Sequence, residues 1–182
     1  YAQNDVLTAY VNRPDKERDV IRRTLDAYAE AVGRSARGWL SSSLRSTHET
    51  PHILKELGLL FQADYLNDDQ PYLLNTRHGP LVCIPYSNDV NDFAVFSRGG
   101  GTTTQALELF KEQFDQLYME GAASGRIMNV GMHPHVMGQA YAIRALREFV
   151  DYVKTFNGVW YPKREEMAEW FLETGTRHRE VS

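Results

Sequence analysis

Two histidines separated by one proline follow an apolar stretch, in the segment "VGMHPHVMG" at positions 130–138. On an extended chain, side chains two positions apart face the same way, so His133 and His135 could point together into a pocket. Such a pair can hold zinc when at least one more protein ligand is present. A histidine at the end of a strand can instead transfer a proton near neutral pH. The third interpretation is an ordinary loop, in which one ring hydrogen-bonds to a neighbouring backbone group.

Two further segments are rich in acidic and amide side chains. In "NDDQPY", Asp68 and Asp69 could form a carboxylate pair for acid–base chemistry, although neighbours on an extended chain face opposite ways. A solvated turn, in which an aspartate accepts from backbone amides, explains this segment equally well. In "IPYSNDVND", the side chains of Tyr86, Asn91 and Asp92 would suit a polar ligand that bears an amide group.

Two other motifs resemble known binding sites only in part. "HETPH" has the spacing of a metal-binding histidine pair, but Pro51 begins a helix there and leaves His48 outside it, so the two rings need not converge. "SRGGGTTT" lacks the Gly-Lys-Ser/Thr ending of a phosphate-binding loop and the spacing of a dinucleotide fingerprint. We interpret it as a flexible turn, with a threonine available to cap the following helix.

Helices and strands alternate along the chain. Apolar periodicity and capping residues predict helices at 14–32, 51–58, 105–122, 141–156 and 163–173, the first of them ending at Gly33. Short apolar runs predict strands at 37–41, 59–66, 80–87, 126–132 and 158–162. This order predicts an α/β fold with a largely parallel sheet or barrel, and the polar segments above follow its strands.

Composition restricts the class of protein. Of 182 residues, 42% are hydrophobic and 24% are charged, which predicts one globular domain over residues 1–182, irregular at 1–13 and 174–182. The net charge of −4 and the absence of a long basic block argue against nucleic acid or an anionic membrane as a partner. Cys83 is the one cysteine, compatible with a reducing, cytoplasmic compartment. The chain starts at Tyr1, and we expect it to be part of a longer polypeptide.

Several motifs in order resemble the polysaccharide deacetylase superfamily, and within it the allantoinase-like and cyclic-imidase-like branch. The resemblance extends from about Pro14 to Leu172, and these stretches carry it: "GRSARGWLS", "LLFQADYLNDDQPYLL", "PLVCIPYSNDVND", "QALELFKEQFDQLYMEGA", "RIMNVGMHPHVMGQAYAIRALREFVDYV" and "GVWYPKREEMAEWF". It implies an incomplete (β/α) barrel and hydrolysis of a carbon–nitrogen bond that is not a peptide bond. The substrate would be an N-acetylated amino sugar or a small cyclic amide such as allantoin.

The resemblance also implies roles for individual residues. His133 falls where the family has its general acid. Substrate contact is expected from Trp39, Asp68, Asp69, Tyr86, Asn91, Asp92 and His135. The family's opening aspartate motif and its following His-x-x-x-His pair have no match upstream of Pro14, and "HETPH" comes too late in the chain to replace them.

This departure predicts the C-terminal part of such a barrel, without its N-terminal strands. A divalent metal such as zinc would then be held mainly by residues absent from this chain. Expected partners are a small-molecule or sugar amide substrate and either further copies of the chain or the missing N-terminal part. The alternative function is a non-catalytic binding or assembly module that retains the pocket.

Overall fold

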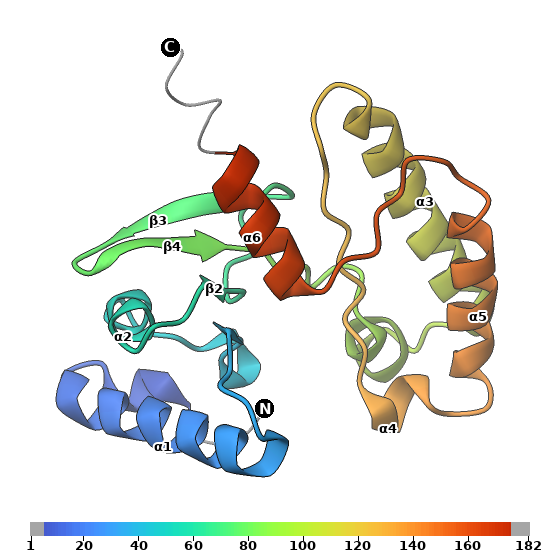
Figure 1. Ribbon diagram of the computed structural model, residues 1–182. Coiled ribbons are helices and arrows are strands. Elements are labelled where there is room, and N and C mark those ends of the chain that lie inside the picture. Colours follow the sequence, from blue (N-terminus) through green and yellow to red (C-terminus); the bar gives the residue numbers. More distant parts are fainter. Residues whose placement is uncertain (1–5, 176–182) are drawn as a thin grey trace. The chain divides into compact units, whose positions relative to one another are not determined.

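The computed structural model describes residues 6–175, which form two compact units (Figure 1). Among these residues, unit 1 comprises 6–85 and 162–175, and unit 2 comprises Tyr86–Tyr161. Each unit has its own hydrophobic core.

Unit 1 contains a four-stranded sheet in the order β1-β2-β4-β3. Its elements are η1 (Leu7–Tyr10), α1 (Pro14–Val32), β1 (Gly38–Trp39), η2 (Ser42–Leu44), α2 (Thr50–Glu56), β2 (Phe61–Gln62), β3 (Tyr72–Thr76), β4 (Gly79–Cys83) and α6 (Arg164–Thr174). The strands β1, β2 and β4 run parallel, and β3 pairs antiparallel with β4. The fold is therefore mixed α/β, as the alternation of elements predicted.

The helix α1 follows the local signals that predicted it. It begins at Pro14, and Gly33 ends it in the left-handed conformation, with φ of 75°. Its apolar face contributes Val20 and Ile21 to the core of unit 1, whose other buried members are Leu7, Ile53, Leu54, Leu59 and Leu81. Glu17 on the same helix is fully buried, and its carboxylate accepts hydrogen bonds from the hydroxyls of Thr47 and Thr50.

The strands of unit 1 differ from the prediction in two ways. The paired parts of β1 and β2 have two residues each, much shorter than the apolar runs around them. The strand β3 was not predicted. A tight turn joins its end to the start of β4, where Gly79 has φ of 102°, and the two strands pair antiparallel. The short helix η1 also lies within residues 1–13, which were predicted to be irregular.

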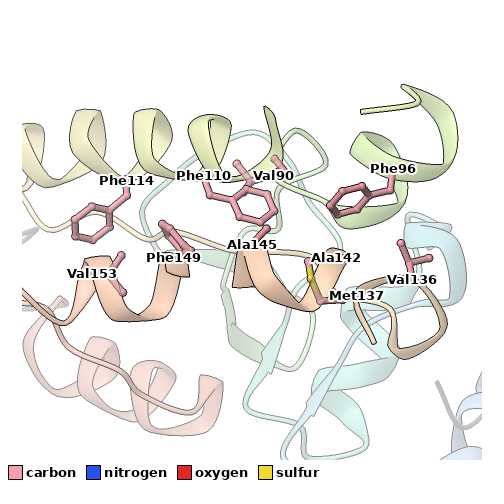
Figure 2. Close-up of a cluster of buried hydrophobic side chains, with 11 residues drawn as sticks. Val90, Phe96, Phe110, Phe114, Val136, Met137, Ala142, Ala145, Phe149 and Val153 are labelled. Carbon is pink, nitrogen blue, oxygen red and sulfur yellow. The ribbon is translucent and has the colours of Figure 1, made fainter. Parts of the chain in front are cut away.

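Unit 2 is helical. It contains η3 (Phe93–Arg98), α3 (Thr103–Gly121), α4 (Pro134–Met137) and α5 (Ala142–Val153). Thr102 caps α3, because its hydroxyl accepts from the backbone N–H of Gln105 while the Gln105 side chain accepts from the backbone N–H of Thr102. Aromatic and small residues pack between α3 and α5, including Phe110, Ala145 and Phe149 (Figure 2).

The strands predicted at 126–132 and 158–162 do not form in unit 2. The first segment makes a single parallel bridge, between Gly131 and Asn91, and the second makes no strand pairing within the described residues. A strand requires a partner with which to exchange backbone hydrogen bonds, and the described residues provide only the short segment around Asn91. The bridge is nevertheless important, because it positions the candidate site.

Candidate functional site

The parallel bridge brings two distant parts of unit 2 together. The backbone N–H of Gly131 donates to Val90 O at 2.8 Å, and the N–H of Asp92 donates to Gly131 O at 2.9 Å. As a result, the "NDVND" segment lies beside the "MHPH" segment, although about 40 residues separate them in the chain. These are two of the three segments that the sequence identified as candidates for chemistry.

Asp92 and His133 form the centre of this site. The Asp92 side chain is fully buried, and its two oxygens accept from the backbone N–H and from Nδ1 of His133, both at 2.7 Å. Because a carboxylate can only accept, Nδ1 carries the hydrogen and Nε2 is the ring nitrogen left for chemistry. The His133 side chain is 32% exposed, so a ligand can approach the ring. The arrangement is that of a histidine oriented for proton transfer by a buried carboxylate.

Asn91 and Tyr86 support the loop on which this pair stands. Asn91 Oδ1 accepts from the backbone N–H of Phe93 at 2.9 Å, and its Nδ2 donates to the Tyr86 hydroxyl at 3.3 Å. A Cβ added at Gly131 would overlap both the Asn91 amide and the Tyr86 hydroxyl, so only glycine fits opposite them. Both polar ends of Asn91 are therefore used within the protein, and so are both oxygens of Asp92.

Two aromatic rings lie next to His133. The centroid of the Phe93 ring is 5.7 Å from that of the His133 ring. The centroid of the His135 ring is also 5.7 Å from that of His133. His133 has extended backbone, whereas His135 lies in the short helix α4. The two histidines are thus neighbours, although not through the extended-chain geometry that the sequence interpretation assumed.

The described residues do not fit a metal ion. Among residues 6–175, no three His, Cys, Asp or Glu side chains are grouped so that they could hold one. In "HETPH", Nδ1 of His52 accepts from the backbone N–H of Arg77, while His48 lies outside α2 beside Glu49. The expected zinc therefore has no ligand set in this part of the chain.

Unit 1 holds the remaining predicted residues. The indole N–H of Trp39 donates to the Ser41 hydroxyl at 2.9 Å, and that hydroxyl donates to Asp64 at 2.7 Å. The backbone N–H of Ser41 donates to the other oxygen of Asp64 at 2.6 Å. Burial raises the pKa of Asp64 above its ordinary value of 3.8, although the hydrogen bonds from Ser41 oppose this effect.

Asp64 and Ser41 were missed by the sequence interpretation. The available signal was "FQAD", where polar residues interrupt a run that is otherwise apolar and buried. A buried polar group needs a partner, so such an interruption indicates an interaction with another element. Here the other element is β1 with the loop that follows it, because Trp39 ends the strand and Ser41 lies in that loop.

Asp68 and Asp69 occupy a turn of unit 1. Asp68 accepts from the backbone N–H groups of Asp69 and Gln70, at 2.8 and 3.0 Å, which is the turn geometry that the sequence left open. Their grouping with the His133 pair, like that of Trp39, stays a prediction. Burial also raises the pKa of the Cys83 thiol to about 11, so this cysteine stays protonated near neutral pH and is a poor nucleophile.

Trp39 lines a cavity of unit 1. The cavity has a volume of about 380 Å³, within the size range of small-molecule sites. Tyr28 and Phe61 contribute aromatic walls, and Arg37 and Lys163 bring positive charge to it. Part of this charge is neutralised, because Arg37 pairs with Glu169 at 2.8 Å.

Within the described residues, no helix is long and apolar enough to cross a membrane. No protein-family model matches the chain. A curated protein of Schizosaccharomyces pombe, named "Putative polysaccharide deacetylase", is 27% identical over 173 residues, which cover 86% of this chain and 54% of that protein.

Solved structures give a similar result. A probable polysaccharide deacetylase from Pseudomonas aeruginosa PAO1 is 28% identical with a TM-score of 0.80, and Puue allantoinase is 30% identical with a TM-score of 0.81. Each match covers 88% of this chain and 54% of the other. The chain therefore spans about half the length of these relatives. In sequence and in fold, the comparisons confirm the resemblance to the polysaccharide deacetylases and to allantoinase that the motifs had indicated.

Proposed function

We propose that this chain is the C-terminal part of a (β/α) barrel that hydrolyses a non-peptide carbon–nitrogen bond, with His133 as general acid. The observation that carries the proposal is the buried Asp92 carboxylate, hydrogen-bonded to Nδ1 of His133 beside an accessible ring. The relatives named above support the reaction class. The substrate class is an N-acetylated amino sugar or a small cyclic amide such as allantoin.

In the proposed reaction, water adds to the amide carbonyl and the carbon–nitrogen bond then breaks. The departing nitrogen needs a proton, because an amide anion is a very poor leaving group. Protonated His133 donates that proton from Nε2 and retains its hydrogen on Nδ1, where Asp92 holds it. The nitrogen leaves as a neutral amine or amide and the acyl carbon becomes a carboxylic acid. Activation of the water is not assigned to any described residue.

The same geometry changes the roles proposed for two residues. Asp92 was expected to contact substrate, but it is fully buried and both of its oxygens bind His133. Asn91 is likewise occupied by Phe93 and Tyr86. We therefore propose Asp92 and Asn91 as positioning residues, while His135 and Tyr86 stay candidates for substrate contact.

The test is turnover by the complete polypeptide with N-acetylated amino sugars, allantoin and cyclic imides as substrates. We expect His133→Ala to lower kcat by about 10²- to 10⁴-fold, which is the usual contribution of one general acid. Asp92→Asn should lower kcat strongly with a small change in KM, because an amide can donate to Nδ1 and so favour the wrong tautomer. His48→Ala, in unit 1, is the matched control and should leave kcat unchanged, because the His48 side chain is 72% exposed and has no role in the proposed reaction. Parent-like turnover by His133→Ala would exclude the role.

A second candidate is a non-catalytic binding module, and one observation favours it: the described residues include no group that could hold a metal ion. The two functions differ in turnover. A complete polypeptide that binds cyclic amides tightly but hydrolyses none of the panel would support the binding module.

A further inference from the structure

Residues 93–98, between Asp92 and the glycine run, form an unusual helical turn. The segment Phe93–Arg98 is a π-helix, and the backbone N–H of Gly99 donates to Ala94 O, five residues back, at 2.9 Å. In an α-helix, residues five apart point about 140° away from each other around the axis. The wider π turn aligns them, so Phe93 and Arg98 come to lie on one face. Such turns are rare and are frequently found at functional sites.

The glycine run makes this turn possible. A Cβ at Gly101 would come within 2.9 Å of Val95 O, and a Cβ at Gly99 within 3.0 Å of the same atom. Gly100 between them has φ of 60°, a conformation that other residues rarely adopt. The "GGG" segment, interpreted from sequence as a flexible turn, is therefore required by close backbone packing at the end of the π-helix.

The result is that a cation and the proposed acid both contact one aromatic ring, that of Phe93. The Arg98 guanidinium carbon lies over the Phe93 ring, 5.4 Å from its centroid, and the His133 ring lies 5.7 Å from the same centroid. Arg98 is exposed, and within residues 6–175 no carboxylate forms an ion pair with it. The nearby Asp92 is buried and engaged with His133, so Arg98 supplies the accessible charge on this side of the site.

From this arrangement we propose that Arg98 makes the His133 site selective for amides that also carry a negatively charged group, such as a carboxylate. The guanidinium would bind the carboxylate through paired hydrogen bonds, and its contact with Phe93 limits where the charge can sit. The span from Arg98 across Phe93 to His133 suits a small molecule with the anion at one end and the amide at the other. This inference rests on one part of the proposed function, which is that His133 is the residue that reacts with the amide.

The test is a binding comparison of hydantoin-5-acetate with its methyl ester, by isothermal titration on the complete polypeptide. The two probes differ by one negative charge. We expect the parent to bind the acid about tenfold or more tightly than the ester, because hydrogen bonds between a guanidinium and a carboxylate are stronger than those to an uncharged ester. Arg98→Met should remove this preference, and Arg98→Lys should retain part of it.

Lys111→Met is the matched control. Lys111 lies over the Tyr152 ring in the same unit, 4.7 Å from its centroid, so the substitution removes a similar cation–aromatic pair away from His133. It should leave the preference for the acid unchanged. No preference in the parent, including no binding of either probe, overturns the inference, as does a preference that survives Arg98→Met. If the parent binds the acid more tightly than the ester but hydrolyses no amide, the proposed function is wrong and the charge selectivity is established.

Discussion

Two buried aspartates illustrate how partners decide the behaviour of a side chain. Asp92 and Asp64 are both almost inaccessible to solvent. Asp92 accepts from His133, a side chain that can carry a positive charge, whereas Asp64 accepts from the neutral Ser41. Burial raises the pKa of Asp64, and the hydrogen bonds from Ser41 only partly oppose this effect. The same residue type therefore serves two different purposes in this chain.

This raised pKa predicts how stability depends on pH. Between the ordinary value of 3.8 and the higher value in the folded protein, the folded state holds more protons than the unfolded state, so the stability contributed by Asp64 is lost as the pH rises. Asp64→Asn cannot titrate. The free energy of unfolding of this variant, relative to the parent, should therefore increase from about pH 4 to about pH 7 in urea titrations.

Asp26→Asn, at an exposed position of α1, serves as the control for that experiment. A difference between Asp64→Asn and the parent that stays constant, or shrinks as the pH rises, would contradict the prediction.

At the level of elements, one bridge and one glycine position the candidate site. The bridge between Asn91 and Gly131 is a backbone pairing that places Asp92 beside His133. The space opposite Asn91 and Tyr86 admits no Cβ at position 131. A pairing of only two residues is therefore as important to the site as the long helices of unit 2.

Gly131→Ala should consequently destabilise unit 2 by about 1–3 kcal/mol, the usual cost of forcing extra volume into a packed site. Gly125→Ala is the matched control, because a Cβ there meets nothing within 4 Å. The measurements are urea unfolding and the NMR signals of the His133 ring, which should shift in the first variant only. Identical behaviour of the two variants would show that the loop accommodates a side chain at position 131.

At the scale of the whole molecule, the residues that the structure describes form two hydrophobic cores. One contains Phe110 and Phe149 of unit 2, and the other contains Ile21 and Leu54 of unit 1. Separate cores can open separately, because local unfolding follows the packing of each cooperative region.

Phe110→Ala and Leu54→Ala test this division, and each should cost roughly 2–5 kcal/mol because each side chain is fully buried. Hydrogen exchange should show lost protection mainly in unit 2 for Phe110→Ala and mainly in unit 1 for Leu54→Ala. Equal losses in both units from either substitution would support the single domain that the composition predicted.

Much of the helical structure could be predicted from sequence because its signals are local. Pro14, Gly33 and Thr102 set helix boundaries through their own backbone and capping properties, which depend on a few neighbouring residues. The segments that form the site were also identified, since histidines and acidic residues after apolar runs are visible in any sequence. The strand β3 and the π-helix were not predicted. Each is defined by which backbone groups hydrogen-bond to each other, and the local pattern of apolar and polar residues does not specify those partners.

The sequence alone thus determined which residues have the chemistry: His133, with the acidic and amide residues of "NDVND". The tertiary structure decided how they are used, by burying Asp92 against Nδ1 of His133 and by placing Arg98 over Phe93. The physical reason is that residue type fixes which groups can donate, accept or carry charge, whereas burial and partner distance fix which of them does so.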